Sequence, residues 1–296
     1  MSPVPTATAT FVDLLMVADL PAPGAWWTRW ELDLPAIAVM VGLGALYLRG
    51  ETLWRRDTGG ARPHRVAAFV AGWVVALLSL VSPVAALSGD LLWIHMIQHL
   101  LMVIVAAPLL ALGAPQSAVR RAVGPGPRRA VSAAVRRLSL RRRGWAPPTV
   151  VIAAVVHIAA LWVWHIPALY DLAATNAFVH LLEHAFFLGT AVWFWMAVVA
   201  ATRRGRRQHA LAALMLAAQI ATGGVLGALL TFTPRSIYDA YDGGWGLTAL
   251  EDQQFAGSLM WVPPSFVYAI TAIALFIRWF DLVERDARRR EARTRI

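Results

Sequence analysis

The chain alternates between long apolar runs and short connections rich in charged residues. Seven of these runs are nearly free of charged side chains, and about 20 helical residues suffice to cross the ~30 Å hydrocarbon layer of a bilayer. We therefore predict an all-α fold, a polytopic membrane helix bundle with seven transmembrane helices. The predicted spans cover residues 33–49, 65–82, 91–112, 149–166, 178–200, 209–231 and 253–280.

The charged connections differ in sign from one to the next. Of the 27 basic residues, all of them arginine, 25 lie in residues 49–65, 113–148, 201–208 and 278–295. The other connections are acidic and carry Asp90, Asp171, Asp239, Asp242, Glu251 and Asp252. Because cytoplasmic loops are enriched in basic residues, we predict that the N-terminus is outside and the C-terminus is cytoplasmic.

This orientation divides the chain into three parts. Residues 1–32 form a predicted extracytoplasmic N-terminal segment. Residues 33–280 form the seven-helix membrane domain, in which residues 113–148 are a basic cytoplasmic loop suited to anionic headgroups. Residues 281–296 form a basic cytoplasmic tail.

Composition supports a membrane protein and excludes several chemistries. Hydrophobic residues make up 58% of the chain, against roughly 45–50% in soluble domains. The net charge of +10 is explained by the arginine-rich loops, so we expect a lipid bilayer and no nucleic acid as partner. The absence of cysteine excludes thiolate metal sites and c-type haem attachment. The absence of lysine excludes a retinal Schiff base. No acid–base pair or nucleophile constellation indicates an enzyme.

Two histidine pairs stand out inside the apolar runs. In "WIHMIQHLLM", His95 and His99 are four residues apart and share one helix face. In "FVHLLEHAFF", His180 and His184 repeat the spacing. With about 1.5 Å of rise per residue, the predicted orientation places both pairs one to two turns below the outer surface. Ionisable residues at such depth indicate a functional site.

Three further residues are expected in the same shallow layer. His165 ends the fourth span, Asp252 begins the seventh, and Met260 lies two turns deeper in it. We therefore predict a metal or cofactor site whose candidate metal ligands are His95, His99, His165, His180, His184, Asp252 and Met260. Within this set, His165 is either a fifth nitrogen ligand or part of a second site.

Two other polar residues are expected to play supporting roles. His157 lies deeper in the fourth span without a partner at helical spacing, so we expect it to hydrogen-bond a neighbouring helix. Glu183 points about a quarter-turn away from the two histidines that flank it. We expect it to orient a histidine on another helix instead.

The residue types limit which metal or cofactor could bind, but they do not identify it. Neutral imidazole suits copper, zinc, iron and nickel, and a nearby methionine without any thiolate favours copper. Zinc remains allowed. Haem held by histidines from two facing helices is the main competitor. A spacing of four residues cannot serve two stacked haems, but it does not exclude one.

Several stretches of the sequence resemble the successive motifs of one family. They are "HMIQHLLM", "APLLALGAP", "LWVWHIPALYDLA", "HLLEHAFFLGTAVWFW" and "DQQFAGSLMW". Together these resemble the CtaG-type, seven-span cytochrome c oxidase assembly factors of bacteria. The resemblance covers roughly residues 91–265 and is poor over residues 1–60. It implies delivery of copper to an oxidase copper centre. The residues to which the resemblance extends this role lie in the matching motifs and are His95, His99, His165, His180, His184, Asp252, Gln253 and Met260.

The resulting hypothesis is a copper-binding assembly factor in the bacterial cell (inner) membrane. Its expected partners are a cytochrome c oxidase subunit or a periplasmic copper donor. A haem-binding membrane redox protein is the first alternative. A copper transporter is the second, although the polar layer lies on the outer side only, since the inner halves of the third to fifth spans carry few polar groups.

Overall fold

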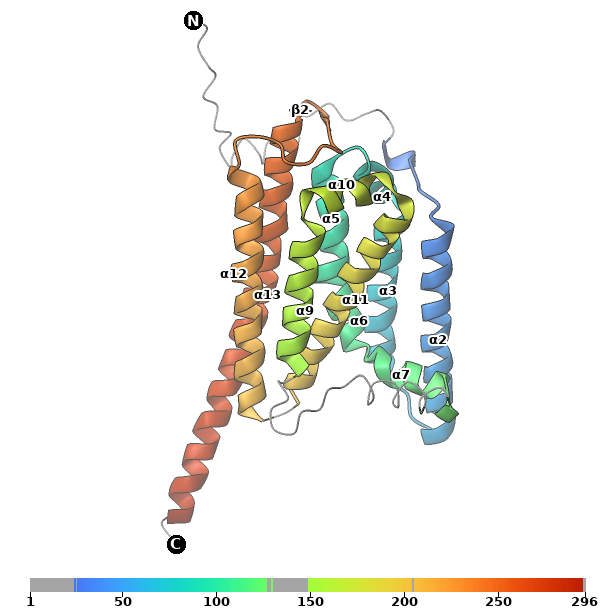
Figure 1. Ribbon diagram of the computed structural model, residues 1–296. Helices are drawn as coiled ribbons and strands as arrows, with labels where there is room; N and C mark the ends of the chain where they lie inside the picture. Colours follow the sequence, from blue (N-terminus) through green and yellow to red (C-terminus); the bar gives the residue numbers. More distant parts are fainter. Residues whose placement is uncertain (1–23, 25, 127–128, 130–148, 204, 295–296) are drawn as a thin grey trace, which may run out of the picture.

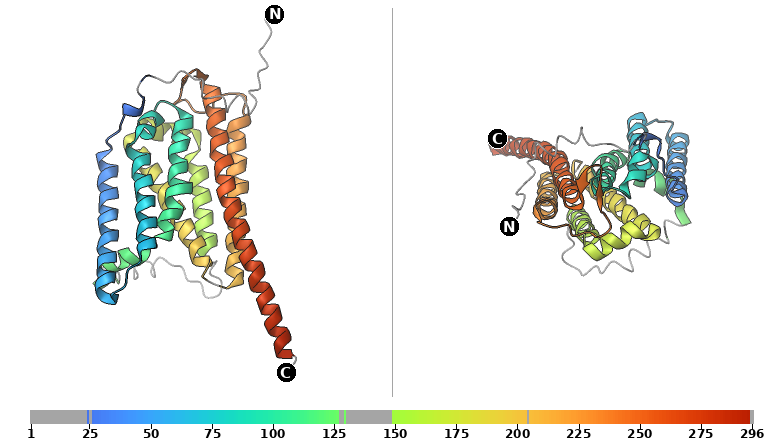
Figure 2. Two further views of the ribbon diagram at one scale, coloured as in Figure 1. Left: turned by 180° about the vertical axis from the view of Figure 1, so that it is seen from behind. Right: turned by 90° about the horizontal axis from the view of Figure 1, so that it is seen from above.

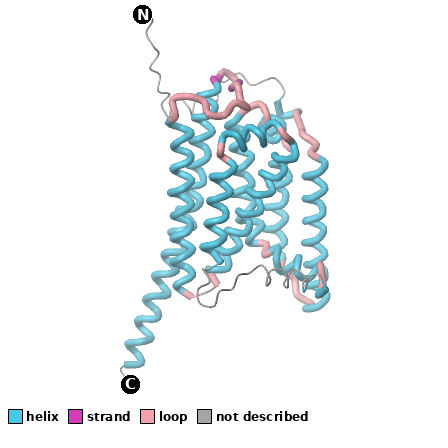
Figure 3. Tube along the Cα trace, viewed as in Figure 1, coloured by secondary structure: helices cyan, strands magenta, loops and turns pink. Residues whose placement is uncertain are grey.

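The fold is almost entirely helical (Figure 3). The structure, a computed structural model, describes residues 24, 26–126, 129, 149–203 and 205–294. In this part of the chain the strands are β1 (Gly243–Gly244) and β2 (Leu247–Thr248), which form a small antiparallel hairpin. The prediction of an all-α membrane bundle is confirmed. Most of the predicted N-terminal segment 1–32 and of the basic loop 113–148 lies outside the described residues.

Six helical segments in the described residues are long and apolar enough to cross a membrane. They are α2 (Leu34–Thr58), α3 (Pro63–Val81), the continuous run of α5 (Leu92–Leu100), η3 (Leu101–Ala106) and α6 (Ala107–Leu112), α11 (Ala177–Ala201), α12 (Arg206–Phe232) and α13 (Ala249–Thr294). A seventh span arises if α9 (Thr149–Trp164) and α10 (Pro167–Thr175), bent by 77° at their junction, count as one. Which end faces outward remains a prediction from the arginines.

Two helices extend well past the spans predicted for them. The second span was expected to begin after a loop at 49–65, but α2 continues to Thr58 and ends where Gly59 adopts a left-handed φ of 65°. The apolar run used for the prediction ends at Arg49. The helix continues beyond it because backbone hydrogen bonding does not require apolar side chains. A partly buried ion pair joins Glu51 in this extension to Arg62, 2.5 Å apart. Likewise α13 runs through Pro263 and Pro264 to Thr294 rather than ending near residue 280.

The helices form a bundle with two different ends (Figure 1). The short helices α4 (Pro83–Ser88) and α10 and the β hairpin lie at the upper end in that view, and α7 (Pro115–Ala122) lies at the lower end. A further short helix, η2 (Trp26–Thr28), precedes α2. Seen from above, α12 and α13 lie side by side at one edge and α2 stands at the other (Figure 2).

Glycine allows α12 and α13 to approach closely. A Cβ atom on Gly257 would lie 2.7 Å from Thr231 Oγ1 and 2.8 Å from Leu230 Cβ. A Cβ on Gly227 would meet the Trp261 side chain at 2.5 Å. Small residues at such positions are what lets membrane helices pack backbone to backbone. This contact therefore depends on the absence of a side chain at both glycines.

We expect Gly257→Ala to destabilise the protein by about 1–3 kcal/mol, because the added methyl forces the two helices apart. The thermal unfolding midpoint of the detergent-solubilised protein measures this. Gly42→Ala is the matched control: a Cβ there meets nothing within 4 Å, and alanine is the better helix former. An unchanged midpoint in Gly257→Ala would contradict the close packing.

Candidate metal centre

Both histidine pairs lie in the first turns of helices that begin at the same end of the bundle. His95 and His99 follow the start of α5 at Leu92. His180 and His184 follow the start of α11 at Ala177. Asn176 caps the start of α11, because its side-chain oxygen accepts hydrogen bonds from the backbone amides of Phe178 and Val179. The equal spacing from each helix start places the pairs at a common depth.

The structure brings these four imidazoles into one cluster, hereafter the histidine cluster. Within the pairs, ring centroids are 4.3 Å apart for His95 and His99 and 4.1 Å apart for His180 and His184. Across the two helices, His95 lies 5.4 Å from His180. His99 lies 5.3 Å from His184. The two helices therefore present their histidines to each other rather than to lipid.

The cluster contains buried polar atoms that have no hydrogen-bond partner. The Nε2 atom of each of its four histidines is in this state, and so are both carboxylate oxygens of Glu183. Leaving such atoms unpartnered is costly, and in native structures each one requires an explanation. A bound cation would explain all of them together.

Glu183 faces the histidines of the other helix, as its helical position suggested. Its Oε2 lies 3.9 Å from His95 Nε2. Among the described residues, two sets of side chains have ligating atoms within 4.8 Å of one another and could hold a metal ion. One is His95 with His180 and His184, and the other is His95 with His99 and Glu183. His95 belongs to both sets and is the centre of the cluster.

Tyr241, in the connection before α13, selects the tautomer of His95. Its hydroxyl donates to the Ser88 carbonyl over 3.0 Å and lies 3.1 Å from His95 Nδ1. Burial raises the pKa of the Tyr241 phenol, so the phenol stays protonated. Its one proton is donated to the Ser88 carbonyl. His95 Nδ1–H must then be the donor to Tyr241, which leaves the Nε2 lone pair free to bind a cation. Sequence patterns did not single out Tyr241, since it lies in a loop.

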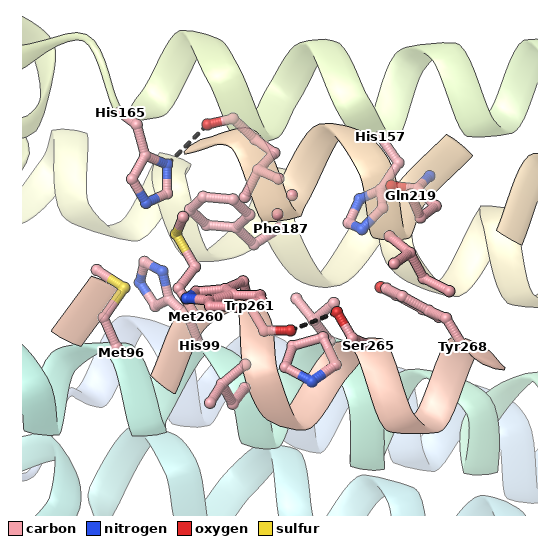
Figure 4. Close-up of a pocket in the computed structure, with 17 residues that line it drawn as sticks. Met96, His99, His157, His165, Phe187, Gln219, Met260, Trp261, Ser265 and Tyr268 are labelled. Carbon is pink, nitrogen blue, oxygen red and sulfur yellow. Dashed lines mark hydrogen bonds between the residues drawn. The ribbon is translucent and has the colours of Figure 1, made fainter. Parts of the chain in front are cut away.

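His165 lies beside the cluster and contacts the same aromatic rings as its members. Tyr170 lies 5.6 Å from His95 and 5.9 Å from His165 between ring centroids. Phe187 lies 4.6 Å from His99 and 6.1 Å from His165. His165 instead lines a cavity with Met260 and His99 (Figure 4). His165 thus lies in a second group of possible ligands next to the histidine cluster.

Asp252 and Gln253 hold backbone rather than face the cluster. The two Asp252 carboxylate oxygens accept hydrogen bonds from the Leu92 and Trp93 amides, each over 2.9 Å. The Gln253 side-chain oxygen accepts from the Ile237 amide over 2.7 Å. Asp252 therefore caps α5 from the start of α13, which positions His95 and His99 indirectly.

His157 behaves as expected of a lone intramembrane histidine. Its Nδ1 lies 2.9 Å from Thr190 Oγ1 on α11. Because the Thr190 hydroxyl donates to the Phe186 carbonyl over 2.6 Å, His157 Nδ1–H donates to Thr190. The prediction of a hydrogen bond to a neighbouring helix is confirmed.

One backbone feature beside the cluster was not predicted. Two residues after His99, the π-helical segment η3 begins and spans Leu101–Ala106. Segments of this kind are rare and occur frequently at functional sites. The apolar sequence "LMVIVA" carries no residue that distinguishes a π-helix from an α-helix.

Fold and site together define a polytopic membrane protein with a buried histidine cluster at one end of its bundle. Residues 45–281 match the family model described as cytochrome c oxidase caa3 assembly factor, Caa3_CtaG. The chain belongs to this family, which confirms the resemblance seen in the motifs.

A curated relative of undefined function is also similar to the chain. An uncharacterized protein of Mycobacterium leprae (strain TN) is 23% identical over 292 residues, which cover 90% of this chain and 42% of the relative. The chain therefore spans less than half the length of that relative. No solved structure matches the chain.

Asp252→Ala should lower the free energy of unfolding of the metal-free protein by about 2–3 kcal/mol, because two backbone amides lose a charged acceptor. Asp252→Asn keeps one acceptor oxygen and should lose less. Thermal unfolding in detergent with a chelator present measures both. A metal-free Asp252→Ala protein as stable as the unsubstituted one would rule out the capping role.

Proposed function

We propose that this protein binds copper at the histidine cluster and helps to insert it into cytochrome c oxidase, as a membrane assembly factor. The observation that carries the proposal is the convergence of four unpartnered Nε2 atoms and the Glu183 carboxylate in one buried group. Copper is the cargo of the protein rather than a catalytic group, and no chemical step is assigned to the chain. The family description, which names the oxidase, supports the destination.

The donor chemistry supports a cargo that is taken up and released. Imidazole and carboxylate ligands suit copper and also zinc. The chain has no cysteine, so no thiolate cage retains the ion. Within the cluster, His95, His99 and His184 are buried while His180 is half-buried. His180 is therefore the member of the cluster that an arriving or departing ion reaches first.

Haem fits the cluster less well than an ion does. A haem would have to lie between two axial histidines from facing helices. The rings of His95 and His180 are 5.4 Å apart between centroids, and the rings of His99 and His184 are 5.3 Å apart. Such direct contacts leave no slot for a macrocycle between α5 and α11.

Transport of copper across the membrane is also less well supported. Both groups of side chains that could hold a metal, among the residues that the structure describes, lie at one end of the bundle. A transport path would need further binding groups deeper in the membrane. We therefore propose that loading takes place at the face predicted to be outside, in the bacterial inner membrane, with an oxidase subunit or a periplasmic copper donor as partner.

We expect His95→Ala and His184→Ala to abolish copper binding, because each removes a nitrogen from the centre of the cluster. The measurement is elemental analysis and an absorption spectrum of the purified, copper-loaded protein. His64→Ala is the control, since His64 is exposed at the start of α3. Full copper in both cluster variants would refute the site, and a haem absorption band lost in them would favour the redox alternative.

The cellular role is tested in a strain that lacks this protein. We expect its cytochrome c oxidase to be copper-deficient and inactive, and His64→Ala to restore it where His184→Ala does not. The readouts are the copper content and activity of the isolated oxidase. An oxidase with full copper in the deletion strain would contradict the assembly role. Copper binding itself is tested separately, by the elemental analysis of the purified protein.

A further inference from the structure

A cavity beside the histidine cluster collects a second set of donor groups. It lies between α5, the end of α9, α11, α12 and α13. At one end it is lined by His99, His165, Met96 and Met260, and at the other by His157, Gln219 and Tyr268 (Figure 4). The first end is the part of the cavity nearest to the histidine cluster, because His99 belongs to both.

The two histidines of this end have nitrogen atoms without partners. His165 and His99 are 5% and 6% exposed, and the Nε2 atom of each lacks a hydrogen bond. His165 Nδ1–H donates to the Leu161 carbonyl over 2.7 Å, so the Nε2 lone pair is the free one. In Figure 4 this second nitrogen points away from the hydrogen bond, toward the side where His99 lies.

Two of the polar groups at the other end of the cavity, His157 and Gln219, already have protein partners. His157 pairs with Thr190, and the Gln219 amide donates to the Ala154 carbonyl over 3.3 Å. Among the histidines that line the cavity, the buried nitrogen atoms without a partner thus belong to His99 and His165, at the end that holds the two methionines. This contrast indicates a site at that end rather than a generally polar cavity.

The possible ligands that line the cavity include soft thioether sulfurs and no carboxylate. Met96 and Met260 are 2% and 7% exposed, and the described lining residues include no Asp or Glu. Thioether sulfur with imidazole nitrogen selects Cu(I), whereas carboxylates suit harder, divalent ions. The histidine cluster, which includes Glu183, offers the harder set of the two.

We propose that this end of the cavity is a second, cuprous site formed by the Nε2 atoms of His99 and His165 and the thioethers of Met96 and Met260. His99 is shared with the histidine cluster, so an ion passes between the sites without leaving the protein. This inference rests on the proposed copper function, because the cluster is the route by which copper reaches the cavity.

The test is anaerobic Cu(I) titration of the full-length protein in detergent, against a coloured Cu(I) chelator and with ascorbate present. Copper X-ray absorption on the same samples reports sulfur ligands. We compare the unsubstituted protein with Met96→Leu/Met260→Leu, which nearly conserves side-chain volume. Met102→Leu is the matched control, because Met102 is buried in the same span but does not line this cavity. His180→Ala/His184→Ala removes half of the histidine cluster.

The unsubstituted protein and Met102→Leu should bind two Cu(I) ions and show copper–sulfur scattering, with one ion at His95, His180 and His184 and the other in the cavity. Met96→Leu/Met260→Leu should lose one ion and the sulfur signal, with an unchanged thermal midpoint. Binding of two ions without a sulfur signal, or an unaltered signal in the double Met variant, overturns the second site. If His180→Ala/His184→Ala still binds both ions, the histidine cluster is not a copper site. The second site is then judged separately, by whether Met96→Leu/Met260→Leu loses one ion and the sulfur signal.

Discussion

The hydrogen bonds from the start of α5 to Asp252 are the interaction on which the site depends. A helix that begins inside an apolar bundle must find acceptors for its first amides. Leu92 is 1% exposed, and its amide and that of Trp93 both reach the Asp252 carboxylate on α13. This bond ties together segments 160 residues apart. It sets where α5 begins and thereby the depth of His95 and His99.

The energetic signature of the site is the concentration of unpartnered polar atoms. More than half of the buried side-chain nitrogen and oxygen atoms that lack a partner, in the part of the chain that the structure describes, belong to the five histidines and Glu183 at this end. Elsewhere in the bundle, polar side chains such as His157 and Gln219 satisfy themselves on neighbouring helices. An apolar medium penalises unpaired donors and acceptors, which is why we propose this group as the ligand site.

Two kinds of donor set occur side by side, and His99 links them. The histidine cluster combines imidazole with the Glu183 carboxylate, while the cavity combines imidazole with thioethers. The π-helical segment η3 begins two residues after His99. A wider turn changes the angular position of every residue that follows it on the helix, so the inner half of this span faces different neighbours than an α-helix would provide.

The sequence by itself determined the all-α membrane class and the helical pairing of His95 with His99 and of His180 with His184. These follow from apolar run length and from the 3.6-residue period, which are local properties. Only the tertiary structure decided which donors meet. Rotation of each helix about its axis and the 77° bend between α9 and α10 are set by packing against distant segments. For this reason, Asp252 caps α5 instead of facing the histidines. His165 lines the neighbouring cavity together with His99, and Tyr241 from a loop orients His95.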